Sequence, residues 1–473
     1  MNVNRKIKPS FLTAILLGAT LTSFASVPVS ANDQLKLPPV KKVKLKNGMT
    51  LLLMERHGVP IVSFNVIVKA GSVADPVGKE GLAAITADML KKGTKARTED
   101  QISEQTDFIG GEVGFDAGGD FTRGAAEFLK KDIDKGLDLL SDVMINPTFP
   151  QDEVEKDKKQ TIDQLKSAKD DASNVIGIYF DAFLYGDHPY ARPVDGTETS
   201  IANITRDDIL KFYESYYSPS NTILAVAGDI NIADMENVLT SKFEPWSGGP
   251  SPKIELKDAP AVKGKRLLLV DKPDSTQTYF MIGNVGIART NPDRVYINVV
   301  NTLFGGRFTS LLNSGLRINS GLTYGADSSF EQLRAAGPFA ISSYTANEST
   351  EKAIDMALSI LKDLHEKGIT EQQLTSAKNY IKGQYPPRVE TSDQLASLMT
   401  TLEYYGLDES DVNNLYAKID SMTLADANRI IKQYFPTDDL VFVLIGKASE
   451  IQKIASKYAP QIKVKSISDP SFN

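Results

Sequence analysis

The 473-residue sequence contains no cysteine and only three histidines, His57, His188 and His365. A chain without cysteine forms no disulfide and has no thiol nucleophile. Histidine is a frequent ligand of catalytic zinc, and two zinc histidines on one helix face are four residues apart. The three histidines here are too widely separated for that spacing. We therefore interpret each as a surface or helix-capping residue.

Several other features are absent. The chain has no G-x-S-x-G nucleophile motif, and "FGGRF" at residues 304–308 is too short for a phosphate loop and lacks Gly-Lys-Ser/Thr. Beyond the N-terminal segment, no run approaches the ~20 apolar residues that span a bilayer. The formal net charge is −7. This acidity disfavours nucleic acid and anionic lipid as partners.

The first 31 residues have the pattern of a secretory signal peptide. A basic start (Arg5, Lys6, Lys8) precedes an apolar stretch, and "VSA" ending at Ala31 is a small-x-small cleavage site. We predict cleavage after Ala31 and a periplasmic mature protein that has no contact with the membrane, with an uncleaved anchor as the alternative. Residues 1–31 carry +3 and no acidic residue, so the remainder carries −10.

The rest of the chain contains one unit twice. Residues 130–168 and 349–385 each read as an amphipathic helix, a turn with Pro or Gly, and a second, capped helix. Residues 209–230 and 430–448 each read as helix, aromatic pair, Pro turn and buried strand. The repeat predicts two homologous domains.

Strand patterns open both halves, and the first includes the Asn47-Gly48 hairpin signal. We predict an α+β fold in which each domain has an antiparallel-rich sheet covered by helices. The expected domains are residues 35–245 and 265–473, each of ordinary domain size. Residues 246–264, rich in Pro, Gly and Lys, are the expected linker.

Three stretches carry a family resemblance that extends over nearly the whole mature chain. They are "VKAGSVADPVGKEGLAAITADMLKKGT" (68–94), "HPYARPVDGTETSIANITRDDILKFYESYYSPSNTILAVAGDI" (188–230) and "GGRFTSLLNSGLRINSGLTYGADSS" (305–329). The chain resembles the M16 metallopeptidases, the insulinase and mitochondrial processing peptidase group. This resemblance implies the M16/LuxS-like metallohydrolase fold of two homologous domains.

The resemblance also implies where a zinc site is expected. Catalytic members carry H-x-x-E-H after "GLA", so that two histidines share one zinc, the glutamate activates its water, and a later glutamate completes the ligands. The corresponding positions here are Ala84, Ala87, Asp88 and, in "TIDQLKSA", Gln164. Alanine offers no donor and glutamine only a neutral amide. We expect no metal in this chain and a zinc ion in a partner.

Two residues of the second half match family positions that contact substrate. In "GLRINSGLTYGADSS" these are Arg317 and Tyr324. A phenol can donate a hydrogen bond to a developing oxyanion, and a guanidinium can hold peptide carbonyls. The structural alternatives are that Arg317 complements a helix dipole and that Tyr324 packs in a strand. Residues 108–128 resemble the strand that pairs with the substrate backbone.

The resemblance therefore predicts a non-catalytic, substrate-binding subunit of a two-chain periplasmic zinc endopeptidase, inactive alone. Its partner would be a homologue bearing H-x-x-E-H, and its substrate a peptide or unfolded protein. Arg317 and Tyr324 would act in the partner's site. The alternative is a peptide-binding or scaffold protein with no role in proteolysis. An independent enzyme with another site is disfavoured, because no nucleophile has an adjacent base.

Overall fold

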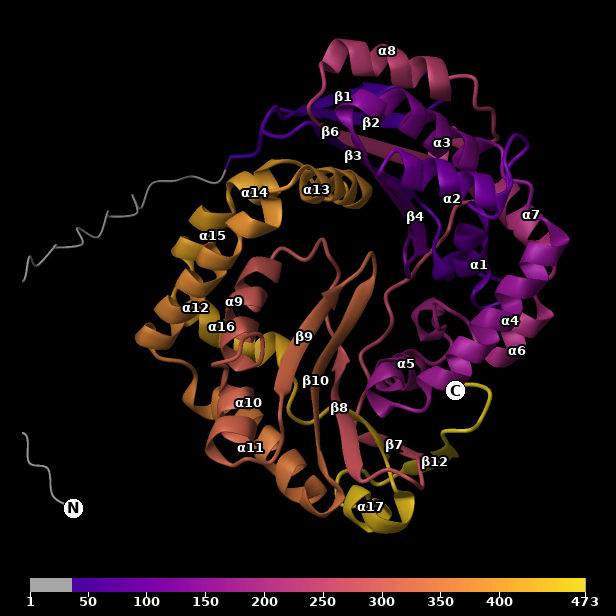
Figure 1. Cartoon of the computed structure of the whole chain (residues 1–473). Helices are drawn as coiled ribbons and strands as arrows, with labels where there is room; N and C mark the ends of the chain where they lie inside the picture. The colour runs from indigo at the N-terminus through magenta and orange to yellow at the C-terminus, as the bar shows by residue number, and fades with distance from the viewer. Residues whose placement is uncertain (1–35, 473) are drawn as a thin grey trace, which may run out of the picture. The chain divides into compact units, whose positions relative to one another are not determined.

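Two six-stranded sheets organise residues 36–472, which are the residues that the computed structural model describes (Figure 1). The strands of the first sheet are β1 (Lys41–Lys44), β2 (Thr50–Glu55), β3 (Ile61–Val68), β4 (Glu112–Ala117), β5 (Thr122–Leu129) and β6 (Thr222–Gly228). Those of the second are β7 (Arg266–Asp271), β8 (Gln277–Val285), β9 (Ala326–Gln332), β10 (Ala336–Ala346), β11 (Val441–Gly446) and β12 (Ile462–Ser466). The predicted signal peptide, residues 1–31, lies outside the described residues.

The strand orders of the two sheets correspond position by position. The first is β1-β2-β6-β3-β5-β4 and the second is β12-β7-β11-β8-β10-β9. Both are mixed sheets in which antiparallel pairs predominate, as the prediction of antiparallel-rich sheets requires. The outer strand differs, because β1 pairs antiparallel with β2 whereas β12 pairs parallel with β7. The repeat therefore holds for five strands of each sheet, including the edge strands β4 and β9, and the sixth strand runs in opposite directions in the two sheets.

The expected hairpin joins β1 and β2. Gly48 adopts a φ of 94°, in the left-handed region that favours glycine. The side-chain amide of Asn47 donates to the carbonyl oxygen of Phe243 at 2.7 Å. The Asn-Gly turn therefore also connects the sheet to the end of α8, the last helix of the first half.

The helices follow the sequence repeat. The first half contains α1 (Leu82–Met89), α2 (Glu99–Phe108), α3 (Ile133–Ile145), α4 (Gln151–Ala168), α5 (Ala172–Tyr185), α6 (Glu198–Asn203), α7 (Arg206–Tyr216) and α8 (Ile232–Phe243). The second contains α9 (Arg294–Phe304), α10 (Leu311–Asn313), α11 (Thr350–Lys367), α12 (Glu371–Gln384), α13 (Ser392–Tyr405), α14 (Ser410–Asn413), α15 (Leu415–Ser421), α16 (Leu424–Tyr434) and α17 (Ala448–Ala455). The predicted helix pairs are α3–α4 and α11–α12.

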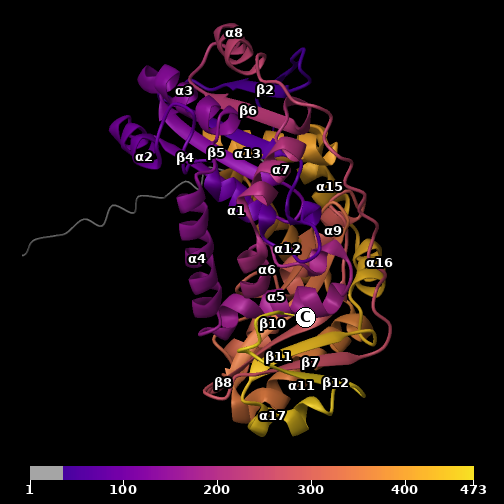
Figure 2. The ribbon, with the colours of Figure 1, turned by 90° about the vertical axis from the view of Figure 1, so that its right-hand side faces the viewer.

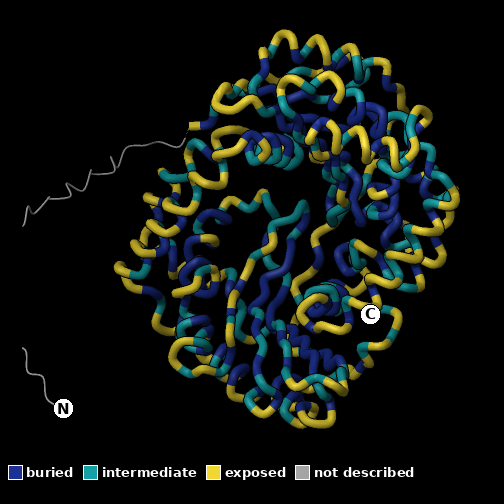
Figure 3. The backbone as a smooth tube through the Cα atoms, in the orientation of Figure 1, coloured by how far each residue is buried: buried dark blue, intermediate teal, exposed yellow. Residues whose placement is uncertain are grey.

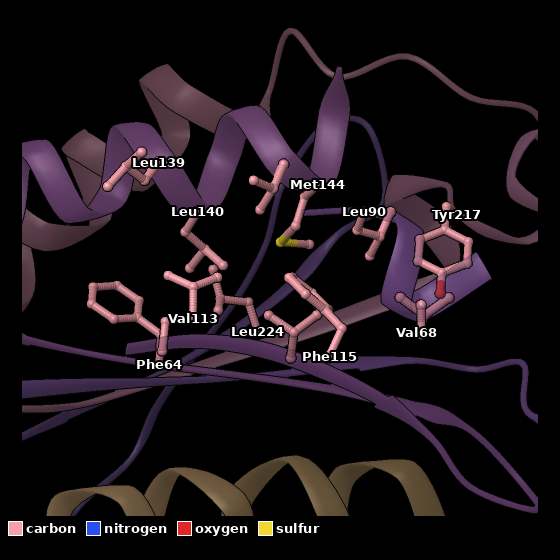
Figure 4. Close-up of a cluster of buried hydrophobic side chains, with 14 of the residues drawn as sticks. Phe64, Val68, Leu90, Val113, Phe115, Leu139, Leu140, Met144, Tyr217 and Leu224 are labelled. Carbon is pink, nitrogen blue, oxygen red and sulfur yellow. The ribbon is translucent and has the colours of Figure 1, made fainter. Parts of the chain in front are cut away.

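One face of each sheet packs against helices of its own half. In the first half, Leu139, Leu140 and Met144 of α3 lie over Phe64 and other apolar residues of the sheet (Figure 4). The equivalent core of the second half includes α9, α11 and α16. Buried backbone accordingly runs through both sheets, with exposed residues on the outer helices (Figure 3).

The opposite face of each sheet is covered by a helix from the other half. Leu395 and Met399 of α13 pack on Leu52 and Ala225 of the first sheet. Reciprocally, α5 packs on β8 and β11 of the second sheet through Val175 and Phe180. Figures 1 and 2 show α13 beside the first sheet and α5 beside the second. α5 follows the helix pair α3–α4 in the first half, and α13 follows the equivalent pair α11–α12 in the second. The halves therefore exchange equivalent helices.

The segment between the halves contains no helix or strand from residue 244 to residue 265. It is nevertheless anchored, because Trp246 and Ala259 are buried. Asn284 also holds Val262 with two hydrogen bonds, accepting from its N–H at 2.9 Å and donating to its carbonyl at 3.0 Å. None of the helices within residues 36–472 is long and apolar enough to cross a membrane. The α+β architecture predicted from the sequence is confirmed.

Candidate functional site

The helix at which the family resemblance places a zinc motif is α1. It begins after Gly81, whose φ of 92° and close approach to Ile201 leave no room for a Cβ atom. The buried carboxylate of Asp75 accepts the N–H groups of Gly81 and Ala83, both at 2.9 Å. This carboxylate therefore caps the first turn. The helix is formed as predicted, so the missing ligands do not reflect a lost fold element.

The four expected ligand positions have different surroundings. Ala87 is fully buried and Ala84 is half-buried on α1, whereas Asp88 is exposed at the end of the helix. Gln164 is exposed on α4, the helix that packs against α1. Two methyl groups, one carboxylate and one amide do not fit a zinc ion, which prefers imidazole, thiolate and carboxylate donors. We derive no metal-dependent step for this chain.

Carboxylates surround Asp88. Although part of the residue reaches solvent, its pKa is raised to about 7, first because surrounding protein removes water from the carboxyl group and then because of Asp157 on α4 and Asp116 on β4. Lys91 opposes this pKa shift, and Asp195 adds a smaller increase. The pKa values of Asp157 and Asp195 are raised as well, mainly by burial. These residues come from separate parts of the sequence, so their grouping was not predictable from the local motif. Within residues 36–472, no three His, Cys, Asp or Glu side chains are arranged to hold a metal ion.

A cavity of about 1030 Å³ lies beside the edge strand β4. Glu112, Gly114 and Asp116 of β4 line it from the first half. Glu390, just before α13, and Asp393, in its first turn, line it from the second half. Because β4 is the last strand in its sheet, its outer edge is available for strand addition. β4 lies within residues 108–128, the stretch that resembles the family's substrate-pairing strand. Five acidic residues and two basic ones line the cavity.

The three histidines have structural contacts. The ring of His188 accepts the N–H of Tyr190 and so caps the short helical turn at residues 189–191. His57 is exposed and paired with Asp229 at 2.7 Å. His365, near the end of α11, contacts the carbonyl oxygen of Phe435. The interpretation of His57 and His188 as surface and capping residues is confirmed, while His365 fastens α11 to the end of α16.

Arg317 and Tyr324 belong to the segment between α9 and β9. Arg317 lies on the π-helical turn η5 (Ser314–Asn319), and its guanidinium carbon is 4.9 Å from the ring centroid of Phe308. Tyr324 lies in the loop before β9 and is 76% exposed. The alternative that Tyr324 packs in a strand is therefore wrong. Arg317 is in the last turn of η5, so the helix-end interpretation of this residue stays open.

The structure does not bring these two residues to the emptied ligand positions of the same chain. Arg317 and Tyr324 are on the second half, and neither lines the cavity beside β4. The hydroxyl of Tyr324 has no hydrogen-bond partner among residues 36–472. The segment between α9 and β9 thus presents an exposed phenol, that of Tyr324, and a guanidinium, that of Arg317, stacked on an exposed phenylalanine.

Comparison with known proteins gives the same assignment for both halves. Residues 51–198 match the family described as insulinase (peptidase family M16), and residues 203–381 match the peptidase M16 inactive domain. An uncharacterized zinc protease of Bacillus subtilis is 24% identical over 413 residues, covering 87% of this chain and 99% of that protein. One from Rickettsia bellii is 28% identical over 340 residues, covering 72% of this chain and 81% of its own length.

Solved structures share the fold. The peptidase M16 inactive domain from Pseudomonas fluorescens is 25% identical, with a TM-score of 0.81 over 86% of this chain and 98% of that one. A protease from Helicobacter pylori is 23% identical, with a TM-score of 0.80 over 86% of this chain and all of that one. These likenesses, with the helix α1 that lacks zinc ligands, define a peptidase-like chain built from inactive-type domains. The chain belongs to the M16 peptidase family.

Proposed function

We propose that this protein is the non-catalytic, substrate-binding subunit of a two-chain periplasmic M16-type zinc endopeptidase. Its partner is a homologue that carries H-x-x-E-H and the zinc ion. The substrate is an extended peptide or an unfolded protein. Arg317 and Tyr324 of this chain enter the partner's active site.

The observation that carries the proposal is the exposure of Tyr324 at 76% in a chain whose own α1 lacks zinc ligands. An exposed aromatic side chain is common on a protein surface, but tyrosine is enriched where partners dock, and the Tyr324 ring is available for such a contact. On the same half, Phe308 is 61% exposed and lies against the Arg317 guanidinium. Contact of these side chains with a partner is the environment that the proposal gives them.

The chemistry of the two side chains suits peptide hydrolysis in trans. The Tyr324 hydroxyl has no partner within the described chain and is free to donate to the oxyanion that forms at the scissile carbonyl. The Arg317 fork is held by its stacking on Phe308 and can bind peptide carbonyl oxygens. The edge of β4 and its cavity provide a place for the extended substrate chain.

The test is steady-state kinetics of this chain mixed with a homologue that bears H-x-x-E-H from the same organism. Activity is expected only from the mixture and is expected to disappear with a chelator. Tyr324→Phe should lower kcat by roughly 10²-fold, the size expected for one oxyanion donor. Arg317→Ala should mainly raise KM. Tyr380→Phe, which removes the hydroxyl of another exposed tyrosine, is the matched control and should leave both constants unchanged.

Melting curves accompany each variant. Full activity of the Tyr324→Phe and Arg317→Ala mixtures would remove both residues from catalysis and favour the scaffold alternative. Chelator-sensitive peptidase activity of this chain alone would contradict the proposal directly.

A further inference from the structure

A second cavity, of about 410 Å³, lies in the second half beside the edge strand β9. Its walls come from the start of α9, the end of α12 and the helix α14. Three arginines line it, Arg289, Arg294 and Arg388, and the only carboxylate among its lining residues is that of Asp411. The lining thus carries a net charge of +2 in a chain whose formal charge is −7.

Asp411, the one carboxylate in the lining of this cavity, is shared by two arginines. Arg294 and Arg289 both pair with Asp411, the latter at 3.5 Å between Nη2 and Oδ2. Arg289 also donates from Nη1 to the side-chain oxygen of Gln332 at 3.0 Å. One carboxylate cannot neutralise both guanidinium groups, and buried charges are stable only when they are paired.

Donors remain without partners in this cavity. The Nε of Arg289 is buried and makes no hydrogen bond within the described chain. Arg388 forms no ion pair with any residue of 36–472, and the hydroxyl of Tyr385 donates to none of them. Arg294 is only 7% exposed, and burial lowers its pKa and that of Arg289. The first turn of α9 adds the positive end of its dipole.

We propose that this cavity binds an oxyanion, with Arg289, Arg294 and Arg388 as its donors. Guanidinium forks match the two oxygens of a carboxylate or of a phosphate equally well. The ligand is therefore either the free carboxylate of a peptide C-terminus or a phosphate group. This site is separate from Arg317 and Tyr324 and does not depend on a zinc-bearing partner.

The experiment is isothermal titration calorimetry of the purified full chain at low ionic strength with three probes. The probes are inorganic phosphate, a neutral pentapeptide with a free C-terminus, and the same pentapeptide as its C-terminal amide. One saturable site per chain is expected, weakening with added salt. Preference for the free acid over the amide identifies a peptide terminus, and binding of phosphate alone identifies a phosphate group.

Variants connect the binding to the cavity. Arg388→Gln should weaken binding by about tenfold or more, because it removes one charge-assisted contact. Arg388 is exposed and unpaired, so the variant should fold. Lys463→Gln, which removes an exposed cation on β12, is the matched control and should change nothing.

Arg289→Gln should act in the same direction as Arg388→Gln, with its fold checked by circular dichroism. Absence of saturable binding by both phosphate and the free-acid peptide would overturn the proposal. So would binding that neither Arg388→Gln nor Arg289→Gln weakens.

Discussion

The two halves of the molecule share a sheet order but differ in what surrounds the helix that follows their central strands. In the first half this helix is α1, and the pKa of Asp88 near its end is raised to about 7 by burial first and then by neighbouring carboxylates. In the second half the helix is α9, which begins with Arg294 in a cavity with two more arginines. The two equivalent helices thus carry opposite charges, the carboxylate near the end of α1 and the guanidinium at the start of α9. The shared topology sets where the helices lie, and the side chains decide which charge each one presents.

The comparison of the two halves can be extended to their apolar cores, where the largest effects on stability are expected. Phe435 is fully buried, and its ring centroid lies 5.6, 5.2 and 5.4 Å from those of Phe304, Phe330 and Phe339. Phe435→Ala should lower the free energy of unfolding by about 3–5 kcal/mol, since it removes a large ring and leaves a cavity. Urea denaturation measures this value.

In the core of the first half, Phe128 on β5 is likewise buried but has one aromatic partner among residues 36–472, Phe64 at 5.9 Å. Phe128→Ala should destabilise the chain less than Phe435→Ala, because each aromatic pair adds about 0.5–1.5 kcal/mol beyond burial. Phe308→Ala, at an exposed ring, is the control and should have little effect. An equal loss for Phe128→Ala and Phe435→Ala would contradict the role of the aromatic cluster.

The next-largest loss of stability is expected from a substitution at the contact between the two halves. The hydroxyl of Thr400 on α13 donates to the side-chain oxygen of Asn65 on β3 at 2.6 Å, and both residues are buried. Thr400→Val keeps the shape but leaves the Asn65 amide without its partner, which should cost about 1–3 kcal/mol. Hydrogen exchange should then accelerate in β3 although the substitution is in the second half. Thr401→Val is the comparison, because the Thr401 hydroxyl is half-buried and accepts only a weaker bond of 3.2 Å from Arg123 of β5. Exchange in β3 that Thr400→Val leaves unchanged would contradict the coupling.

The carboxylates around Asp88 predict a dependence of stability on pH. The pKa of about 7 lies above the ~3.9 of an unfolded aspartate, so the folded state keeps a proton that the unfolded state releases. Stability contributed by this group is therefore full below pH ~4 and is lost as the pH rises through 7. Asp88→Asn should raise the free energy of unfolding at pH 8 by about 1 kcal/mol after allowance for solvent screening, and the melting temperature should rise with it.

The same variant should have little effect at pH 4. Asp163→Asn on α4 is an exposed control for the loss of one negative charge. If Asp88→Asn does not change the melting temperature at pH 8, the ionised Asp88 does not destabilise the folded state.

The smallest difference concerns two equivalent helix caps. Thr205 and Asp208 of α7, like Thr423 and Asp426 of α16, exchange hydrogen bonds at the first turn. Lys79 adds a bond of 2.8 Å to Asp208 only. Burial works against the Asp208 carboxylate, but the bonds from Lys79 and Thr205 outweigh it and lower its pKa to about 2.

Asp208→Ala should therefore destabilise the chain more than Asp426→Ala, by up to about 1 kcal/mol at pH 7. Because the folded pKa lies below the unfolded value, this contribution is present above pH ~4 and is lost as the pH falls through 2. Paired melts at pH 7 and at pH 3 measure the difference, which should shrink at the lower pH. A difference that persists undiminished would point away from the lysine contact.

The sequence predicted the parts of this structure that depend on local patterns. The Asn47-Gly48 turn, the helix after Gly81 and the paired amphipathic helices each follow from residues close in the chain. The family resemblance identified the positions of Ala84, Ala87 and Asp88 on one helix. The exchange of α5 and α13 was not predicted, because both helices are amphipathic and nothing in their sequences says which sheet they cover.

The charged groupings were also beyond local reasoning. Asp116 and Asp157 reach Asp88 from a strand and a second helix. Arg289 and Arg388 meet at one cavity although about a hundred residues separate them. Only the tertiary fold brings such residues together, and their burial, which gives the charges their effect, is not visible in the chain order.

The reciprocal placement of α5 and α13 makes the molecule resemble a domain-swapped dimer whose two subunits are tied end to end. Each half on its own would present a bare apolar sheet face to water, so neither is a self-sufficient folding unit. A protease that nicks the chain between residues 246 and 264 would leave two fragments clasped together.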